Sequence, residues 1–273
     1  MTKADRSERK PKEANGSARR AASAVLLQLA FVGFCSLLFA STAVAEEIPK
    51  EMNGLPLLFS EDFSSGTAHW DFTDAKVWRI ADQDGNKILE QTGQSDYKPP
   101  HRSPLNLAFI KDLVVSDFVL EFRVQSTGQD VPHRDAVAAW GWQDPAHFYY
   151  AHISRDADAV AHNIHVVDGA DRRPVTANRN TGVKWDDGWH KIRIIRNDRD
   201  IHEISGEGKL ERAGHQTVFQ VFYDSLEKAA LSAVDDRFGP GRLGLGSFDD
   251  TVRIDDVRVW GKIGGGETPP LPR

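Results

Sequence analysis

Cysteine is almost absent from this sequence of 273 residues, and so is helical patterning. The single cysteine, Cys35, lies in an N-terminal apolar stretch that we expect to be removed. The mature chain would then have no disulfide, no cysteine nucleophile and no thiolate metal site.

The chain also lacks an excess of basic residues, since 34 Lys and Arg stand against 40 Asp and Glu. Residues 1–45 hold seven of the basic and three of the acidic residues, so the mature chain would be more acidic than the formal charge of −6. Acidic surfaces repel nucleic acids and anionic membranes, and we predict neither as a partner.

The first 45 residues follow the three-part plan of a secretory signal, with basic residues, an apolar stretch at 24–39 and the small-x-small end Ala43-Val44-Ala45. The apolar stretch is shorter than the roughly 20 residues that a membrane span needs. We predict a signal peptide over residues 1–45, export to the periplasm or the extracellular space, and no membrane span after processing.

Short runs with period-two alternation recur through the rest of the chain, between turn signals. In the clearest run, Phe118, Leu120, Phe122 and Val124 alternate with more polar residues. About a dozen such runs favour an all-β fold, a two-sheet antiparallel jelly-roll sandwich over residues 46–262. The Gly- and Pro-rich end, residues 263–273, is predicted to be a disordered tail.

Two segments are ambiguous. Ser225–Asp236 contains good helix formers, but we interpret it as a hairpin arm that continues the strand at 218–223, because a sandwich needs that pairing. Asp82–Asn86 resembles a calcium loop. Its glycine comes too early and the twelfth position is not glutamate, so we interpret it as an Asp-Gly hairpin turn.

Several short motifs resemble, in order, the strand signatures of concanavalin A-like lectin/glucanase sandwiches. They are Leu58–Phe63, Asp117–Phe122, Trp185–His190, Gly241–Ser247 and Ile254–Val259. The chain is most similar to the 3-keto-disaccharide hydrolase-like domains of secreted bacterial proteins. The resemblance covers nearly the whole mature chain and implies the sandwich, whereas the activity stays open because this fold hosts lectins, glycosidases, lyases and inert modules. The Glu-x-Asp-x-x-Glu strand of laminarinase-like members is missing, which argues against retaining hydrolysis by two carboxylates of one strand.

By the same resemblance, the first and last strands would lie side by side and share a structural calcium ion (Ca2+). Glu61 or Asp62 and Asp255 or Asp256 would supply the carboxylates that suit this hard cation. The alternative is that such acidic residues only cap turns and face solvent.

Five of the ten histidines lie between Pro132 and Val167, among Trp, Tyr, Arg and carboxylates. Aromatic rings stack on sugar faces, while His, Arg, Asp and Asn make directional hydrogen bonds, so this composition favours a glycan site. We predict that a saccharide binds through His133, Asp135, Trp140, Trp142, His147, His162, Asn163 and Arg172.

Period-two geometry places Phe148, Tyr150 and His152 on one face of a strand. Tyr150 and His152 are then either buried and hydrogen-bonded, or part of the floor of a cleft. In a cleft, His152 or Tyr150 would act as general acid/base, with Arg134 as charge stabiliser. A nearby arginine, Arg134 or Arg172, would lower the phenol pKa.

The sequence therefore predicts a secreted protein that binds a saccharide or polysaccharide on its concave sheet face. Whether it also cleaves that ligand, as a hydrolase or a lyase, stays open. The alternative is a non-catalytic structural or cell-surface interaction module, in which the histidines make only structural hydrogen bonds.

Overall fold

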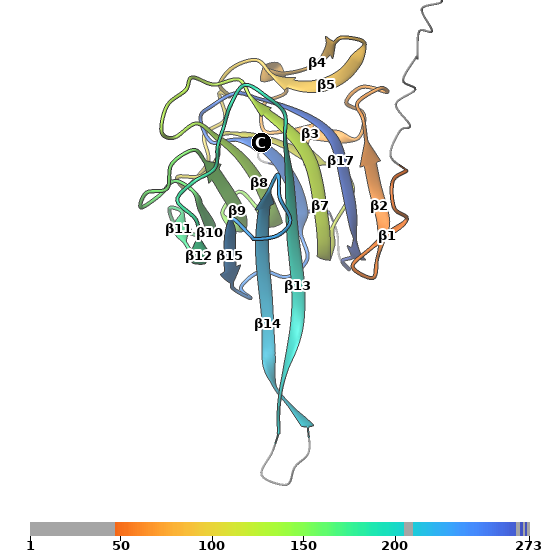
Figure 1. Cartoon of the computed structure of the whole chain (residues 1–273), viewed down its shortest axis with the longest axis vertical. Coiled ribbons are helices and arrows are strands. Elements are labelled where there is room, and N and C mark those ends of the chain that lie inside the picture. The colour runs from red at the N-terminus through yellow and green to blue at the C-terminus, as the bar shows by residue number, and fades with distance from the viewer. Residues whose placement is uncertain (1–46, 205–209, 266–267, 270, 272–273) are drawn as a thin grey trace, which may run out of the picture. The chain divides into compact units, whose positions relative to one another are not determined.

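The computed structural model describes residues 47–204, 210–265, 268, 269 and 271 (Figure 1). The predicted signal peptide lies outside these residues. Within them the one helical segment is a short 3-10 turn, η1 (Ala75–Val77), and no helix is long and apolar enough to cross a membrane.

The described chain forms two antiparallel sheets. The ten-stranded sheet runs in the order β1 (Glu51–Met52), β2 (Leu55–Glu61), β17 (Val252–Ile263), β7 (Val115–Ser126), β13 (His190–Ile204), β14 (Leu210–Tyr223), β15 (Leu231–Val234) and β12 (Thr176–Arg179); the hairpin of β4 (Trp78–Gln83) and β5 (Asn86–Gln91) joins it through β17. The seven-stranded sheet runs in the order β11 (Arg173–Pro174), β10 (Asn163–Asp168), β9 (His147–Ser154), β8 (Asp135–Asp144), β16 (Arg242–Ser247), β6 (Asn106–Ile110) and β3 (Trp70–Phe72). The predicted all-β, two-sheet antiparallel sandwich is confirmed.

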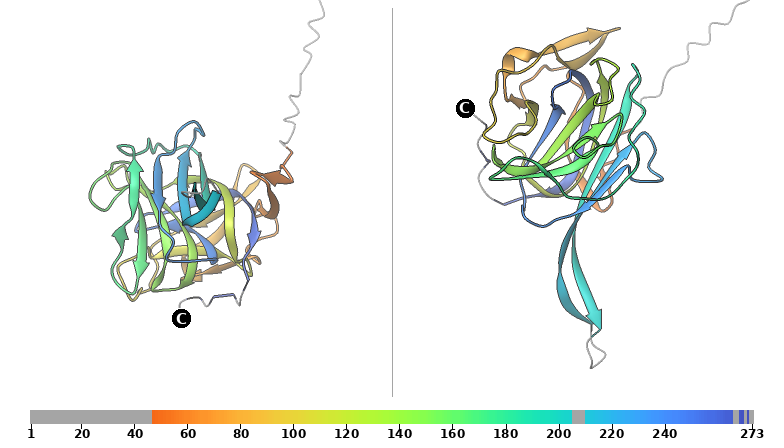
Figure 2. Two further views of the ribbon diagram at one scale, coloured as in Figure 1. Left: turned by 90° about the horizontal axis from the view of Figure 1, so that it is seen from below. Right: turned by 90° about the vertical axis from the view of Figure 1, so that its left-hand side faces the viewer.

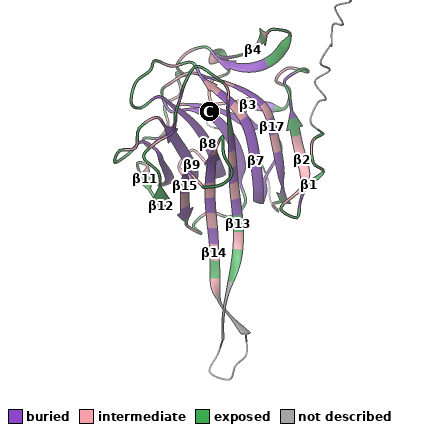
Figure 3. Ribbon diagram, in the orientation of Figure 1, coloured by how far each residue is buried: buried purple, intermediate pink, exposed green. Residues whose placement is uncertain are grey.

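The main core lies between the sheets and follows the alternation of the sequence. Phe118, Leu120, Phe122 and Val124 of β7 all belong to it, together with Trp140 of the opposite sheet. Burying a side chain of this size stabilises the fold by roughly 1.5–3 kcal/mol. Figure 3 shows β7 as buried along most of its length, as expected for a strand inside a sandwich.

The first and last long strands lie side by side, as the family resemblance implies, because β2 pairs with β17 from Glu61 opposite Val257 to Leu57 opposite Trp260. The Asp82–Asn86 segment is the predicted hairpin turn between β4 and β5. Asp84 and Gly85 both have positive φ, 55° and 87°, as a tight two-residue hairpin turn requires.

The hairpin of β13 and β14 is longer than the sequence predicts. The two strands pair from Ile192 opposite Tyr223 to Ile204 opposite Leu210, and the far part projects beyond the sandwich (Figures 1 and 2). The prediction began the second of these strands at residue 218, whereas β14 begins at Leu210. Within Ser225–Asp236 the predicted arm is confirmed for β15, which pairs with β14, and no helix forms there.

Candidate functional site

The outer face of the seven-stranded sheet carries the predicted Tyr150 and His152. On β9 these two side chains share a face with Phe148, as predicted, while Tyr149 and Ile153 point into the main core. Tyr150 is fully buried and His152 is 4% exposed. Of the two arrangements left open by the sequence, the structure has the buried and hydrogen-bonded one.

His152 is held by the carboxylate of Asp135 at the start of the neighbouring strand β8. Its Nε2 lies 2.8 Å from Asp135 Oδ2, and Asp135 Oδ1 accepts the backbone N–H of Phe248 at 3.0 Å. The Phe248 ring stacks on the His152 ring, with centroids 5.5 Å apart and an interplanar angle of 24°. The pair therefore fastens the loop after β16 onto the outer face of the sheet.

Tyr150 accepts a hydrogen bond from the Arg172 guanidinium at 3.1 Å and stacks on His165 of β10, with centroids 4.9 Å apart. Burial raises the pKa of the Tyr150 phenol and outweighs the opposite influence of Arg172. Arg172 does lower this pKa, as predicted, but the net shift is upward because the desolvation of a buried phenolate is the larger effect.

His165 lies in the same cluster and is uncharged. Burial lowers the pKa of its imidazole to about 2, and neither ring nitrogen has a hydrogen-bond partner among the described residues. The cluster beneath the surface is therefore a neutral phenol and a neutral imidazole, with no free base in contact with solvent.

Two arginines lie above this cluster, against the ring of Phe248. The guanidinium carbon of Arg172 is 4.0 Å from the ring centroid and that of Arg102 is 5.8 Å from it. Arg102 is exposed and Arg172 is half-buried. We call the surface formed by Arg102, Arg172 and Phe248 the arginine platform.

The backbones of the two loops that carry these arginines are joined. Arg172 donates its backbone N–H to the Arg102 carbonyl at 3.2 Å, and Arg102 donates its own to Asp171 Oδ1 at 2.9 Å. The fold thus links the two loop backbones, and both guanidinium groups lie against the ring of Phe248.

The other predicted residues near this region do not join the platform. Arg134 is buried and points to the ten-stranded sheet, where it donates to the Ser126 carbonyl at 2.6 Å and to Asp187 at 3.0 Å. That contact contradicts a role for Arg134 as charge stabiliser beside His152. His133 is exposed and contacts Asp158 at 3.0 Å.

His162, Asn163 and His147 likewise make local contacts. His162 Nε2 lies 2.6 Å from Asn180 Oδ1, and burial lowers the pKa of this imidazole to about 4. Asn163 donates to the Ala161 carbonyl at 3.0 Å, and His147 Nδ1 is 2.9 Å from Asp144 Oδ1. His162 and Asn163 are buried, so neither lines an open rim.

The two predicted tryptophans lie on opposite faces of their sheet. Residues two apart normally share a face, but Gly141 has a φ of 58° and the pairing of β8 shifts after Trp140. Trp140 lies in the main core and Trp142 in the outer cluster, and both are at most 1% exposed. Their prediction as sugar-stacking rings was wrong, because neither offers a free ring face.

The carboxylates predicted for calcium each have a local partner. Glu61 accepts the Phe63 N–H at 2.9 Å, Asp62 the Ser64 N–H at 2.9 Å and Asp255 the Asn86 amide at 2.8 Å, while Asp256 pairs with Arg123 at 3.0 Å. Within the described ranges, no group of three or more His, Cys, Asp or Glu side chains is arranged to hold a metal ion. Each of these carboxylates thus has a partner within the protein, and the shared calcium ion stays a prediction.

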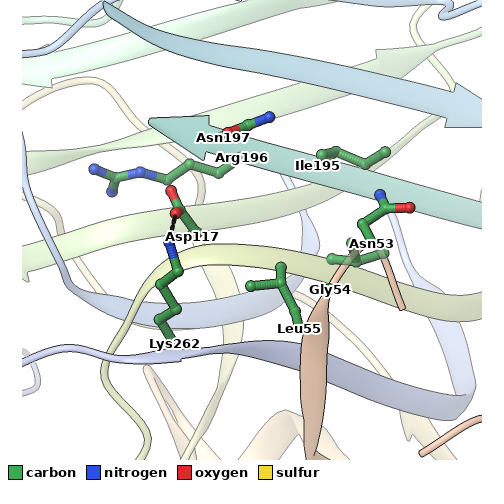
Figure 4. Close-up of a pocket in the computed structure, with 9 residues that line it drawn as sticks. Asn53, Gly54, Leu55, Asp117, Ile195, Arg196, Asn197 and Lys262 are labelled. Carbon is green, nitrogen blue, oxygen red and sulfur yellow. Dashed lines mark hydrogen bonds and ion pairs between the residues drawn. The ribbon is translucent and has the colours of Figure 1, made fainter. Parts of the chain in front are cut away.

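A pocket of about 180 Å³ lies elsewhere, on the outer side of the ten-stranded sheet (Figure 4). Its charged groups are already paired, since Lys262 contacts Asp117 at 2.6 Å and Arg196 donates to the Gly239 carbonyl at 2.6 Å. None of the residues predicted for saccharide binding lines it. The lining residues are Asn53, Gly54, Leu55, Asp117, Val119, Ile195, Arg196, Asn197 and Lys262.

No known family model and no curated protein matches this sequence. Among solved structures, the chain is similar to the carbohydrate-binding module CBM66 from Bacillus subtilis, with 16% identity and a TM-score of 0.44 over 71% of this chain and 97% of that one. It is also similar to a mutant of the GH43 protein BlXynB from Bacillus licheniformis, with 10% identity and a TM-score of 0.49 over 74% and 39%. A third structure, winged bean acidic lectin, has 10% identity and a TM-score of 0.41 over 76% and 98%. The strand pairing of the chain itself shows an all-β, two-sheet antiparallel sandwich, and its chemistry has to be argued from its own side chains.

Sequence reasoning found Arg172 but missed Arg102, His165 and Phe248. His165 could have been found, since alternation places it on the same face of β10 as Asn163. Arg102 and Phe248 could not have been found from the sequence, because they come from loops far apart in the chain and only the fold brings them over β9.

Proposed function

We propose that this protein binds a saccharide at the arginine platform, on the outer face of the seven-stranded sheet. The observation that carries the proposal is that Arg102 and Arg172 meet over Phe248 while neither guanidinium has a carboxylate partner among the described residues. Guanidinium groups that are not neutralised inside the protein present several N–H donors to solvent.

Those donors suit a polyol. Sugar hydroxyl oxygens accept from a guanidinium fork, and a ligand bound at two linked loops needs little rearrangement of the protein. The buried layer below, with Tyr150 held by Arg172 and His152 held by Asp135, supports the platform without reaching the surface. An exported protein would meet such ligands in the cell envelope or the surroundings.

The proposal is binding without cleavage. Catalysis by His152 would need its imidazole within hydrogen-bond reach of the ligand, whereas this ring is buried between Asp135 and Phe248. Catalysis by Tyr150 would need an accessible phenol, and Tyr150 is fully buried.

The test is affinity electrophoresis of the purified protein through gels that contain one soluble polysaccharide each. We expect retardation by at least one polymer, loss of most of that retardation in Arg172→Gln and Arg102→Gln, and no product by mass spectrometry. The matched control is Arg173→Gln, which removes the same charge one residue away, from an exposed side chain 4.0 Å from Asp168. Retardation by no polymer, or equal loss in Arg173→Gln, contradicts the proposal.

A further inference from the structure

The arginine platform differs in its charge balance from the other arginine sites of the molecule. The chain has more acidic than basic residues, and its buried and half-buried arginines are generally paired: Arg253 lies 2.7 Å from Glu90, Arg242 lies 2.6 Å from Asp71 and Arg123 lies 3.0 Å from Asp256. Arg102 and Arg172 have no such partner in the described part of the chain, although they lie against the same ring.

The nearby carboxylates are engaged elsewhere. Asp171 accepts the backbone N–H of Arg102 at 2.9 Å, and Asp135 is buried between His152 and the Phe248 N–H. The fold therefore places two like charges together and directs the local carboxylates to backbone groups and to His152. Two neighbouring guanidinium groups that form no ion pair within the described residues repel each other, and a bound anion reduces that repulsion.

We infer that the saccharide bound at the arginine platform carries a carboxylate, as a uronate residue does, and that this carboxylate lies between the guanidinium groups of Arg102 and Arg172. This inference rests on the function proposed above and names its ligand class. A guanidinium fork matches a carboxylate with two parallel N–H to O bonds, which are stronger than bonds to a neutral hydroxyl.

The geometry leaves donors for this contact. One terminal nitrogen of Arg172 donates to the Tyr150 hydroxyl at 3.1 Å, which orients the group, while Arg102 makes no side-chain hydrogen bond with the described residues. The linked loop backbones and the contact of both side chains with the Phe248 ring reduce the ordering that is needed on binding.

The experiment compares a uronic acid polysaccharide with the same polymer after its carboxyl groups have been reduced to primary alcohols. Binding is measured by isothermal titration calorimetry with the full protein. We expect the reduced polymer to bind at least about tenfold more weakly and the affinity for the acidic polymer to fall steeply as salt is added. Arg172→Gln and Arg102→Gln should each remove most of the preference for the acidic polymer, and Arg173→Gln should keep it.

The failure of this inference and that of the proposed function give different results. If the reduced polymer binds as well as the acidic one, and the two platform variants weaken both equally, saccharide binding stands and the carboxylate inference is wrong. The same conclusion holds if only neutral or only sulfated polymers bind. If no polysaccharide binds, both are wrong. Circular dichroism of each variant checks that the fold is intact.

Discussion

The Nε2 of His152 lies 2.8 Å from Oδ2 of Asp135, and both side chains are buried. Such a pair resembles the base and orienting acid of a hydrolytic site. Here the second Asp135 oxygen accepts the Phe248 N–H, and the His152 ring stacks on the Phe248 ring. Both members of the pair therefore contact the loop after β16. These contacts hold Phe248, the phenylalanine of the arginine platform, in place.

Removing Asp135 should therefore destabilise the protein strongly. Asp135→Ala leaves the buried His152 and the Phe248 N–H without their acceptor, and breaking a buried pair in this way costs about 3–5 kcal/mol. Urea denaturation followed by tryptophan fluorescence gives the free energy of unfolding. A loss below about 1 kcal/mol would show that the pair does not hold the loop.

Two buried histidines should make the fold sensitive to acid. Burial lowers the pKa of His162 to about 4 and that of His165 to about 2, below the ordinary 6.5. The unfolded chain binds these protons first, so the contribution of the two groups is fully present above pH 6.5 and is lost as the pH falls. Each histidine can contribute up to about 1.4 kcal/mol per pH unit to the slope of the free energy of unfolding against pH, between about pH 6 and 4.

His165→Phe tests this, because phenylalanine keeps a ring against Tyr150 and has no group that titrates. We expect the free energy of unfolding of the variant to fall less between pH 6.5 and 4 than that of the wild type. Equal slopes in urea titrations at each pH would show that His165 is protonated alike in both states. The slope is the quantity to compare, because a change in packing alters the free energy of unfolding by the same amount at every pH.

The titration of Asp250 should change the stability in the opposite direction from that of the two histidines. Burial, with the charge of Asp135, raises the pKa of the Asp250 carboxyl from 3.8 to about 6. The folded state then binds this proton more tightly than the unfolded state, so the contribution of Asp250 to stability decreases as the pH rises from about 4 to 6.

Asp250→Asn removes this decrease in stability with rising pH. It keeps an oxygen that can accept the Asp135 N–H, which is 2.8 Å away in the wild type. Relative to the wild type, the variant should gain stability as the pH is raised from 4 to 7, as thermal unfolding at each pH will show. Asp249→Asn changes the exposed neighbour and is the matched control. A constant difference between Asp250→Asn and the wild type across this range would contradict the prediction.

The fold could be predicted from the sequence further than the site could. Alternation in β7 and β9 is a local property, so it correctly assigned Phe118 to the core and placed Tyr150 on the same face of its strand as Phe148. It could not reveal the shift at Gly141 that separates Trp140 from Trp142, because a bulge depends on pairing with the next strand. The arginine platform depends on loops that meet only in the folded chain, which is why Arg102 and Phe248 were missed.

Close packing along β16 gives the last prediction. Gly246 lies between β6 and β8, opposite Leu107 and Val137, and an added Cβ would lie 1.8 Å from the backbone oxygen of Asn106. At Gly244 the nearest atom would be 2.8 Å away, in the ring of Phe109. A backbone oxygen in a central strand cannot move without separating the strands, whereas a ring can shift.

Gly246→Ala should therefore cost about 3 kcal/mol or more of the free energy of unfolding, and Gly244→Ala less. Gly93→Ala is the matched control, because no atom lies within 4 Å of its added Cβ. Urea denaturation of the three variants should rank them in that order, with Gly93→Ala close to the wild type. If Gly246→Ala unfolds at the wild-type urea concentration, the strands beside β16 separate at little cost, and the seven-stranded sheet is not the rigid base that the arginine platform requires.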